Sequence, residues 1–462
     1  MRQGKTATAR LIQRARGFRY SLVWEGIAVG AAAGLVTVLF RLLLSQGDAL
    51  RQALGELLTG RPWLLPLWLV ALLVLAALVT LLLRWEPLIS GSGIPQVEGE
   101  LQGHLSQTWW RVLLAKFVGG LLTIGAGLSL GREGPSIQLG AMAGKGVSRL
   151  CRRDVTEERM LLTCGASAGL AAAFHAPLAG VLFSLEEIHK NFSVSVLVSV
   201  MTASITADYI SGEFLGFTSV FQFDIGQEVA PRYYWHIVIL GVLLGVMGAF
   251  YNKMTIWVQG LYFKAKGLNE TTRLLIPFLL AGVLGLLLPE GLGSGHGLID
   301  MAARGNMVLQ SLAVLFAVKF LFSLICFGSG APGGIFFPLL VLGALLGGMY
   351  STFAVKYMGL EASYISNFVL LAMAGYFTAI VRAPITGIIL IFEMTGQVSQ
   401  MLSMSLVSIV AYLVASGLKS EPIYESLLDS LLRRRGQQVP EKTGGKILQE
   451  FIICHGSPLH KQ

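Results

Sequence analysis

Long apolar runs with few charges recur along the whole chain. One of them is free of charge from Pro62 to Leu83 and lies between Arg61 and Arg84. Its length is about the ~20 residues that a helix needs to cross the hydrocarbon core of a membrane. The other runs lie near 26–45, 160–185, 195–213, 235–251, 273–288, 307–327, 337–355, 364–381 and 401–418. They lack the alternation of barrel strands, so the pattern predicts an all-α membrane protein with many spans.

The composition agrees with this pattern. Of the 462 residues, 54% are hydrophobic and 13% are charged, which is more apolar surface than a water-soluble protein of this length buries. The net charge is +9, and its basic clusters lie beside spans, at 1–20, 149–153 and 433–435. Basic residues beside spans mark the cytoplasmic side, so we expect both termini inside and no nucleic-acid partner. The first apolar run contains Glu25 and Arg41 and is too long for a signal peptide, so we expect it to be retained.

The chain also repeats itself. KFVGGLLTIGAGLSLGREGPSIQLGAMAG, from Lys116, aligns with KFLFSLICFGSGAPGGIFFPLLVLGALLG, from Lys319. In the same order, GSG at 91–93 matches GSG at 293–295, and APLAGVLFSLE matches APITGIILIFE. Repeats with glycine- and proline-broken apolar segments are typical of secondary transporters and related pores, and such repeats are commonly inverted. The alternative is an ancestral duplication with no functional site where the two repeats meet.

This repeat predicts the organisation of the chain. The expected parts are a cytoplasmic N-terminal segment at 1–23, a first membrane repeat at 24–213, a connecting loop at 214–231, a second membrane repeat at 232–428 and a short cytoplasmic tail at 429–462.

Three of the broken segments place glycine shortly before proline: GSGIP at 91–95, GREGP at 131–135 and GGIFFP at 333–338. Proline suits the first turn of a helix and glycine lets the backbone turn sharply, so each segment predicts a helix start. Helix N-termini that converge on one point can bind an anion without a full positive charge. Such a site suits an ion that must leave as readily as it enters.

Two hydroxyl side chains and one acid lie at or near these turns. Ser92 and Tyr424 are candidate anion ligands, with a helix cap and an interfacial tyrosine as the alternatives. Glu133 is a carboxylate within a membrane segment, which costs on the order of 2.5–3.5 kcal/mol and makes it a functional candidate. We do not expect it to pair with Arg132, because adjacent residues of a helix do not face each other. A carboxylate at an anion-binding helix start would compete with the anion, and its protonation would release the site.

A second pair of acids follows in FSLEEIHK. Glu186 has a repeat partner, Glu393, and is therefore predicted to be part of the scaffold. Glu187 has none, and it lies near the cytoplasmic end of a span. It is a candidate proton relay, with an ordinary helix-end charge as the alternative.

Five motifs in order carry a family resemblance: GSGIPQVEG, GREGPSIQLG, GLAAAFHAPLAGVLFSLEE, GAPGGIFFP and the tyrosine of EPIY. Over about 90–428 they resemble the CLC family of chloride channels and chloride/proton exchangers. The resemblance implies a homodimer with one anion pathway per subunit, each built from two inverted halves of tilted and broken helices. It also implies chloride, protons and the lipid bilayer as partners, and a location in the cell (inner) membrane. The expected subtype is the prokaryotic one, without paired regulatory nucleotide-binding domains.

The resemblance also implies roles for particular residues. Chloride would be held at the centre by Ser92, Tyr424 and the backbone amides of Ile335 and Phe336. Glu133 would be the outer gating glutamate, with the amides of Arg132 and Gly134 at an outer site, and Glu187 would be the internal proton glutamate. The acid at 187 favours proton-coupled exchange over a passive channel, and Ser92 favours chloride over nitrate. Three residues depart from the family pattern: Gln96, His175 and Phe337.

An intramembrane enzyme is a remote alternative. GASAG at 165–169 matches the G-x-S-x-G pattern of hydrolases, and GSGAPG at 328–333 matches G-x-G-x-x-G, but neither follows a predicted strand. We interpret both as close helix packing and expect no enzyme activity. The cysteines show no paired spacing, so we expect no disulfide, no metal site and no cofactor; they are Cys151, Cys164, Cys326 and Cys454.

Overall fold

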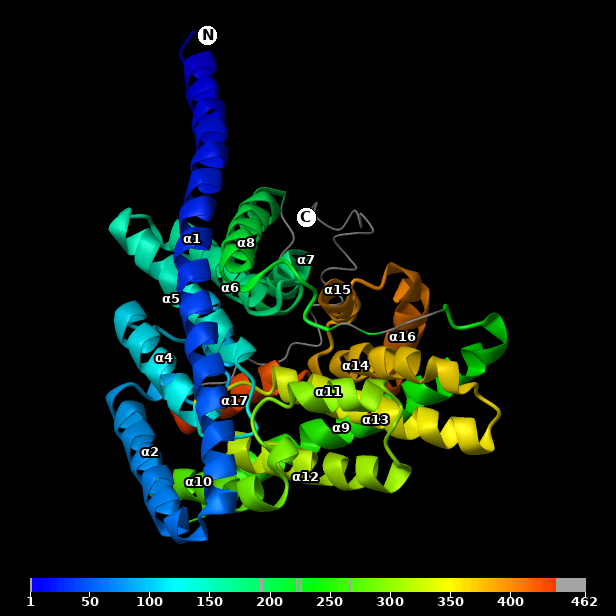
Figure 1. Cartoon of the computed structure of the whole chain (residues 1–462). Coiled ribbons are helices and arrows are strands. Elements are labelled where there is room, and N and C mark those ends of the chain that lie inside the picture. The colour runs from blue at the N-terminus through cyan, green and yellow to red at the C-terminus, as the bar shows by residue number, and fades with distance from the viewer. Residues whose placement is uncertain (1, 191–193, 222, 224–226, 266, 438–462) are drawn as a thin grey trace.

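The computed structural model describes residues 2–190, 194–221, 223, 227–265 and 267–437, and their regular elements are all helical. The α-helices are α1 (Arg2–Gly60), α2 (Leu65–Trp85), α3 (Ile94–Leu101), α4 (Trp109–Gly125), α5 (Glu133–Leu150), α6 (Val155–Phe174), α7 (Pro177–Phe183), α8 (Val194–Leu215), α9 (Tyr234–Lys264), α10 (Glu270–Leu287), α11 (His296–Ala303), α12 (Leu309–Gly328), α13 (Phe336–Tyr357), α14 (Ile365–Val381), α15 (Pro384–Thr395), α16 (Met401–Gly417) and α17 (Ile423–Arg434). A π-helical segment, η3 (Ser184–His189), continues α7. In Figure 1, α1–α8 lie mainly on the left and α11–α16 mainly on the right.

Within this described part, eight helices are long and apolar enough to cross a membrane. They lie at Val23–Leu58, Leu65–Trp85, Pro231–Lys264, Glu270–Leu287, Leu309–Gly328, Phe336–Tyr357, Ala362–Val381 and Val398–Gly417. Many apolar side chains on their outer faces are exposed, such as Leu81 at 58% and Leu413 at 60%. Only a hydrocarbon environment makes such surfaces favourable, so the prediction of an all-α, multi-pass membrane protein is confirmed.

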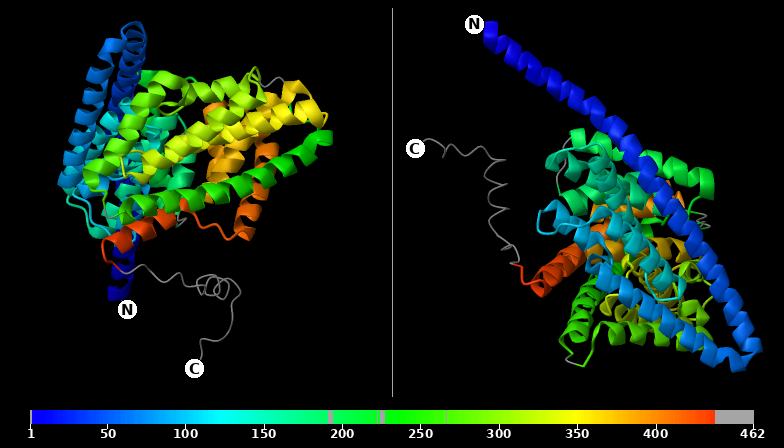
Figure 2. Two further views of the ribbon diagram at one scale, coloured as in Figure 1. Left: turned by 90° about the horizontal axis from the view of Figure 1, so that it is seen from below. Right: turned by 90° about the vertical axis from the view of Figure 1, so that its left-hand side faces the viewer.

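Several boundaries differ from the expected ones. The apolar run at 160–185 is not one span, because α6 ends at Phe174 and α7 begins at Pro177. Proline disfavours helical dihedrals in the residue before it, Ala176, which has φ −139° and ψ 75°, and His175 turns the chain with φ 55°. At the N-terminus, α1 begins at Arg2 and projects beyond the other helices (Figure 2), and α17 continues to Arg434. The predicted boundaries at 23 and 428 therefore lie inside helices.

Equivalent lysines make equivalent contacts in the two halves. The Lys116 ammonium donates to the Gly91 carbonyl at 2.6 Å, and the Lys319 ammonium donates to the Gly293 carbonyl at 2.6 Å. Both side chains are fully buried. Each lysine thus fixes the GSG turn of its own half, and these equivalent contacts support the sequence repeat.

The two halves meet at a pair of equivalent glycines. The Gly131 N–H donates to the Gly334 carbonyl at 2.6 Å, and the Gly334 N–H donates to the Gly131 carbonyl at 2.8 Å. The two segments run antiparallel at this bridge. Repeat partners that pair with each other in opposite directions are related by a two-fold rotation, so the repeats are inverted around this point, as predicted.

Two carboxylates join the halves a second time. Glu393 Oε1 and Oε2 accept from the backbone N–H groups of Leu178 and Ala179 in α7, at 3.0 and 2.7 Å. In the reciprocal contact, Glu186 Oε2 accepts from the Thr386 N–H at 2.9 Å and from its hydroxyl at 2.7 Å. Each acid therefore caps a short helix of the other half, where unpaired N–H groups and the positive dipole end favour a carboxylate. This agrees with the interpretation of Glu186 as part of the scaffold.

Glu393→Gln should lower the stability of the fold. A single amide oxygen replaces the two carboxylate oxygens that accept charge-assisted hydrogen bonds. The free energy of unfolding should fall by about 1–3 kcal/mol. The measurement is the apparent melting temperature of detergent-solubilised protein, followed by the fraction that stays monodisperse after heating. Glu361→Gln is the matched control, because Glu361 is exposed and its 2.5 Å pair with Arg232 should contribute little. Equal shifts in the two variants would contradict the capping role.

The cysteines that the structure describes form no disulfide. Cys164 and Cys326 are buried and free, and Cys151 is exposed and free. Cys454 lies outside the described residues, as does the part of the C-terminal tail from 438 onward.

Candidate functional site

The glycine- and proline-containing turns begin helices, as predicted. α3 begins at Ile94, α5 at Glu133 and α13 at Phe336, and proline lies within the first three residues of each. The first of these turns requires glycine, because Gly93 has φ 97° and a side chain there would collide with Gln138. α17 begins directly after Pro422 and carries Tyr424 as its second residue. Four helix N-termini thus border the region described next.

The turns before α3 and α13 meet the start of α5. A Cβ atom built on Gly134 would lie 2.5 Å from Ser92 Oγ, 2.7 Å from the Ser92 carbonyl oxygen and 3.1 Å from Gly334 Cα. Only a glycine at 134 permits this approach. The structure therefore brings Ser92, Gly134 and the turn that leads into Ile335 together, although they lie far apart in the sequence.

Aromatic rings line the other side. The Phe183 ring lies 5.8 Å from the Phe336 ring and 6.1 Å from the Tyr424 ring, between their centroids. Phe336 also packs against Phe174 at 5.2 Å and Phe377 at 4.8 Å. Phe336 and Tyr424 are fully buried, so this wall keeps the site apolar apart from a few polar atoms.

Those polar atoms lack hydrogen-bond partners within the described part of the chain. They are Ser92 Oγ, Tyr424 Oη and both carboxylate oxygens of Glu133. Ser92 is 2% exposed, and Tyr424 and Glu133 are 0% exposed. A buried polar group without a partner costs roughly 1–3 kcal/mol, so a cluster of such groups in one place indicates a site that binds something.

Glu133 is the first residue of α5, and its carboxylate turns toward α13. A side chain on Gly131 would overlap Glu133 Oε2 and would lie 3.1 Å from the backbone N of Phe337. The carboxylate thus shares a small space with an amide in the first turn of α13. Both helices present their positive ends there, which favours an anionic group.

The expectation that Arg132 does not pair with Glu133 is wrong. Arg132 Nε lies 3.7 Å from Glu133 Oε1. Arg132 caps α5 and lies outside the helix proper, so the rule that adjacent helical residues point apart does not apply to it. At this distance the contact is an ion pair without a hydrogen bond, since Arg132 Nε is among the buried atoms that lack one.

Glu187 lies in η3 and is 5% exposed. Its Oε1 makes no hydrogen bond to any described residue. The nearby cation, Lys190, is held by two other acids, Glu98 at 2.8 Å and Glu425 at 2.5 Å. Burial opposes the charge of Lys190, but these carboxylates outweigh it and hold its pKa above the ordinary value. Both Glu187 and Glu133 lie within electrostatic range of Tyr424.

The three departures from the family pattern each have a structural setting. Gln96 is buried and donates to the Ser90 carbonyl at 2.7 Å. His175 Nδ1 lies 2.8 Å from an Asp208 carboxylate oxygen. The Phe337 ring lies 4.1 Å from the His296 ring, between centroids.

Sequence reasoning missed Arg41, Asp208 and His296 as neighbours of the site. Arg41 lies within electrostatic range of Arg132, Glu133 and Asp208, and it donates to the Ala172 carbonyl at 2.6 Å. In the sequence, Arg41 is only a lone charge in an apolar run, and His296 directly follows the second GSG turn, where its repeat partner is the apolar Ile94. Nothing local indicates that Arg41 comes within electrostatic range of Glu133 or that His296 packs against Phe337.

The two motifs that resemble enzyme signatures are packing elements. GASAG lies within α6, where Gly165 and Gly169 contact the backbone of α5 so closely that a side chain would collide with it. GSGAPG lies in the turn between α12 and α13, where the Gly330 carbonyl accepts from the Gly91 N–H at 3.3 Å. Among the described residues, no three His, Cys, Asp or Glu side chains group in a way that could hold a metal ion.

Comparisons with known proteins agree with this architecture. Residues 74–416 match the family described as voltage gated chloride channel. The chain is 37% identical over 441 residues to the H(+)/Cl(-) exchange transporter ClcA of Vibrio campbellii, covering 91% of this chain and 92% of that protein. It is also 37% identical to ClcA of Cronobacter sakazakii over 430 residues, covering 90% and 91%.

Comparison with solved structures points to the same kind of protein. The crystal structure of a slow cyanobacterial Cl-/H+ antiporter superposes with a TM-score of 0.84 and 31% identity, covering 90% of this chain and 99% of that one. The family match spans most of the chain, and the identity to the two ClcA proteins extends over nearly all of it. The chain is therefore a member of the voltage-gated chloride channel family, the CLC family.

Proposed function

We propose that this protein is a secondary active transporter that exchanges chloride for protons. The relatives named above are H(+)/Cl(-) exchange transporters and a Cl-/H+ antiporter. One observation carries the proposal for this chain: a fully buried carboxylate, Glu133, lies at the N-termini of two helices beside hydroxyls that have no partner among the described residues. Donors of this kind bind an anion, and a carboxylate competes with it.

Each residue of the site has a role in this proposal. Chloride is held at the centre by the hydroxyls of Ser92 and Tyr424 and by the amides of Ile335 and Phe336. The outer position uses the amides of Arg132 and Gly134, and the Glu133 carboxylate takes the same place when no anion is there. Helix N-terminal amides have no partner within their own helix, so they are available to either occupant.

Exchange follows from this competition. While Glu133 is ionised, it occupies the donors that the outer chloride would use. A proton removes its charge and with it the attraction to those donors, so the side chain can leave and chloride can enter. Chloride occupancy and proton binding are then linked thermodynamically, and Glu187 supplies protons from the inner side.

Two other functions make different demands on the site. A passive chloride channel needs the anion donors but no second buried acid, whereas this chain places Glu187 in a buried position near Tyr424. An intramembrane enzyme needs a nucleophile in a substrate cavity. Ser167 of GASAG is instead fully buried within α6, between glycines that pack against α5.

The test is flux in proteoliposomes that contain purified protein. With equal chloride on both sides, an imposed pH gradient should drive chloride uphill, and an imposed chloride gradient should drive protons uphill. Chloride movement that ignores the pH gradient would support the channel instead. No chloride movement at all would remove both proposals.

We also propose that the protein is a homodimer in a cell (inner) membrane with both termini on the cytoplasmic side. The basic clusters beside spans support this orientation, and the family resemblance supports the dimer. Mass photometry should give a protein mass near twice 49.7 kDa after subtraction of the detergent. Cysteine accessibility at engineered positions near each terminus tests the orientation.

Gly134→Ala should weaken chloride binding. The added Cβ would lie 2.5 Å from Ser92 Oγ, so the Ser92 turn must move away from α5. Displacement of one hydroxyl donor should cost about tenfold in chloride affinity, equal to ~1.4 kcal/mol. Isothermal titration calorimetry with chloride measures it.

Gly297→Ala is the matched control for this change. Gly297 is also the second residue of its helix, α11, and a Cβ atom there would meet nothing within 4 Å. Its chloride affinity should equal that of the wild type. Unchanged affinity in Gly134→Ala would contradict the role of Ser92 as a ligand.

A further inference from the structure

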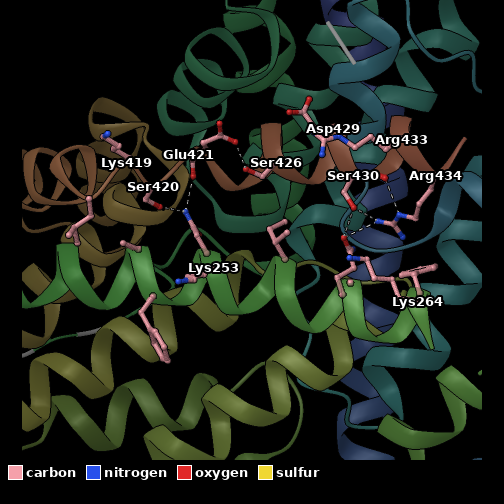
Figure 3. Close-up of a pocket in the computed structure, with 18 of the residues that line it drawn as sticks. Lys253, Lys264, Lys419, Ser420, Glu421, Ser426, Asp429, Ser430, Arg433 and Arg434 are labelled. Carbon is pink, nitrogen blue, oxygen red and sulfur yellow. Dashed lines mark hydrogen bonds between the residues drawn. The ribbon is translucent and has the colours of Figure 1, made fainter. Parts of the chain in front are cut away.

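A cavity lies away from the proposed chloride site, between α9 and α17. Its volume is about 820 Å³, and it is lined by the C-terminal half of α9, by α17 and by the segment that connects α16 to α17. Figure 2 shows α17 beside the end of α9, and Figure 3 shows the polar side chains that line the cavity. None of these residues belongs to the transport mechanism described above.

One end of the cavity is apolar and faces outward. Val246 and Phe250 of α9 line it, and they are 45% and 47% exposed. They belong to a helix long and apolar enough to span the membrane, so their exposed faces meet lipid chains. The cavity therefore opens toward the hydrocarbon of the bilayer at this end.

The charged part of the lining extends along the cavity and is positive overall (Figure 3). Five basic and two acidic side chains line the cavity, namely Lys253, Lys264, Lys419, Arg433 and Arg434 with Glu421 and Asp429. Within the described part of the chain, the first four of these cations make no ion pair and no side-chain hydrogen bond. An excess of positive charge beside an apolar opening attracts an anion that carries hydrocarbon.

Arg434 differs from the other four cations. Its guanidinium donates to Gln259 Oε1 at 2.9 Å and to Ser430 Oγ at 3.0 Å, and it lies 4.0 Å from the centroid of the Phe263 ring. The contacts with Gln259 and Phe263 join α17 to the end of α9 and form one wall of the cavity. The other basic side chains remain available for a ligand in front of it.

We propose that this cavity binds the phosphate headgroup of an anionic phospholipid and that the bound lipid increases the transport rate by holding α17 in place. The acyl chains lie along Val246 and Phe250, and the anionic headgroup is attracted by the basic side chains of the lining, which include Lys253 and Arg433. The effect on rate rests on the proposed function; the binding itself does not.

The link from the cavity to the chloride site runs through Asn252. This α9 side chain donates to the carbonyls of Ile380 and Glu421, at 3.1 and 3.0 Å, and to Ser420 Oγ at 3.2 Å. Glu421 is three residues before Tyr424, whose buried hydroxyl is a proposed chloride ligand. A lipid that ties α9 to α17 therefore restrains the start of α17, where Tyr424 lies.

Lipid binding is tested first, by native mass spectrometry of the full chain with phosphatidylglycerol or phosphatidylcholine. The wild type should retain phosphatidylglycerol, and Lys253→Gln/Arg433→Gln should retain about tenfold less, because each cation near an anionic lipid contributes to attraction. Arg152→Gln/Arg435→Gln removes two exposed cations outside the cavity and should bind like the wild type. Equal retention in both double variants overturns the site.

Competition with inorganic phosphate distinguishes a site for a lipid phosphate headgroup from a site for free phosphate. The cavity is proposed to bind lipid, so added phosphate should displace phosphatidylglycerol only weakly. Complete displacement by inorganic phosphate would show an ordinary phosphate site and overturn the lipid proposal.

The effect on rate is tested in vesicles of phosphatidylcholine with and without phosphatidylglycerol. Chloride flux by the wild type and by Arg152→Gln/Arg435→Gln should be faster with phosphatidylglycerol, and this gain should disappear in Lys253→Gln/Arg433→Gln. Binding without a difference in rate overturns the regulatory part. Wild-type protein that shows no coupled exchange in either vesicle overturns the proposed function instead, and leaves the binding result standing.

Discussion

Glu133→Gln is expected to abolish proton coupling and to leave chloride flux within about tenfold of the wild-type rate, a difference of up to ~1.4 kcal/mol in barrier. The glutamine cannot take up a proton, and it carries no charge that competes with chloride for the helix N-termini. Its volume is close to that of glutamate, so the contacts of the fully buried side chain are largely kept. Chloride then moves down its own gradient, and its flux no longer depends on pH through this residue.

The measurement is simultaneous chloride and proton flux in proteoliposomes under an imposed chloride gradient. Glu25→Gln is the control for loss of a buried carboxylate, because Glu25 is 8% exposed and is paired with Arg153, away from the site. It should keep the coupling of the wild type even if it is less stable. Uphill proton movement by Glu133→Gln would show that another residue is the gate.

The sequence predicts those parts of the site that depend on local backbone rules. Glycine followed by proline within a few residues marks the starts of α3, α5 and α13, because proline suits a first turn and glycine permits the turn before it. The repeat makes the starts of α5 and α13 equivalent, and the Gly131–Gly334 bridge shows that these two meet at the centre. The backbone preferences of glycine and proline, together with the internal repeat, thus locate the site without any comparison to homologous sequences.

Contacts between distant segments leave no such signal. The Glu393 cap on α7 joins segments from the two halves of the chain. Arg41, in the first apolar run, comes within electrostatic range of Glu133 because α1 packs beside α5 and α6. Nor does periodicity reveal that Arg132 lies outside the helix that begins at its neighbour, which is why its ion pair with Glu133 was not predicted.

The surroundings of Glu187 explain why a buried acid there is suited to carry protons. Lys190, the nearest cation, is shared by Glu98 and Glu425, so Glu187 must share it with both of them. Glu98 is itself buried, and burial raises its pKa although it is paired with Lys190. The inner end of the pathway is therefore acidic, and little in it fixes Glu187 in the ionised state.

Glu187→Gln is accordingly expected to stop proton movement while chloride flux continues. Glutamine cannot pass a proton from the inner side, but Ser92, Tyr424 and Glu133 are unchanged, so the anion site remains. Glu186→Gln is the matched control: the residue is adjacent and carries the same charge, but it accepts hydrogen bonds from Thr386 and should keep proton transport at lower stability.

The pH dependence of chloride flux separates this variant from Glu133→Gln. In Glu187→Gln the gate is still a carboxylate, so chloride flux should still rise as the outer pH falls and Glu133 becomes protonated. In Glu133→Gln that dependence should be lost. Proton flux that survives in Glu187→Gln would mean that protons reach Glu133 by another path, whereas loss of both ions' movement would mean that Glu187 supports the anion site itself.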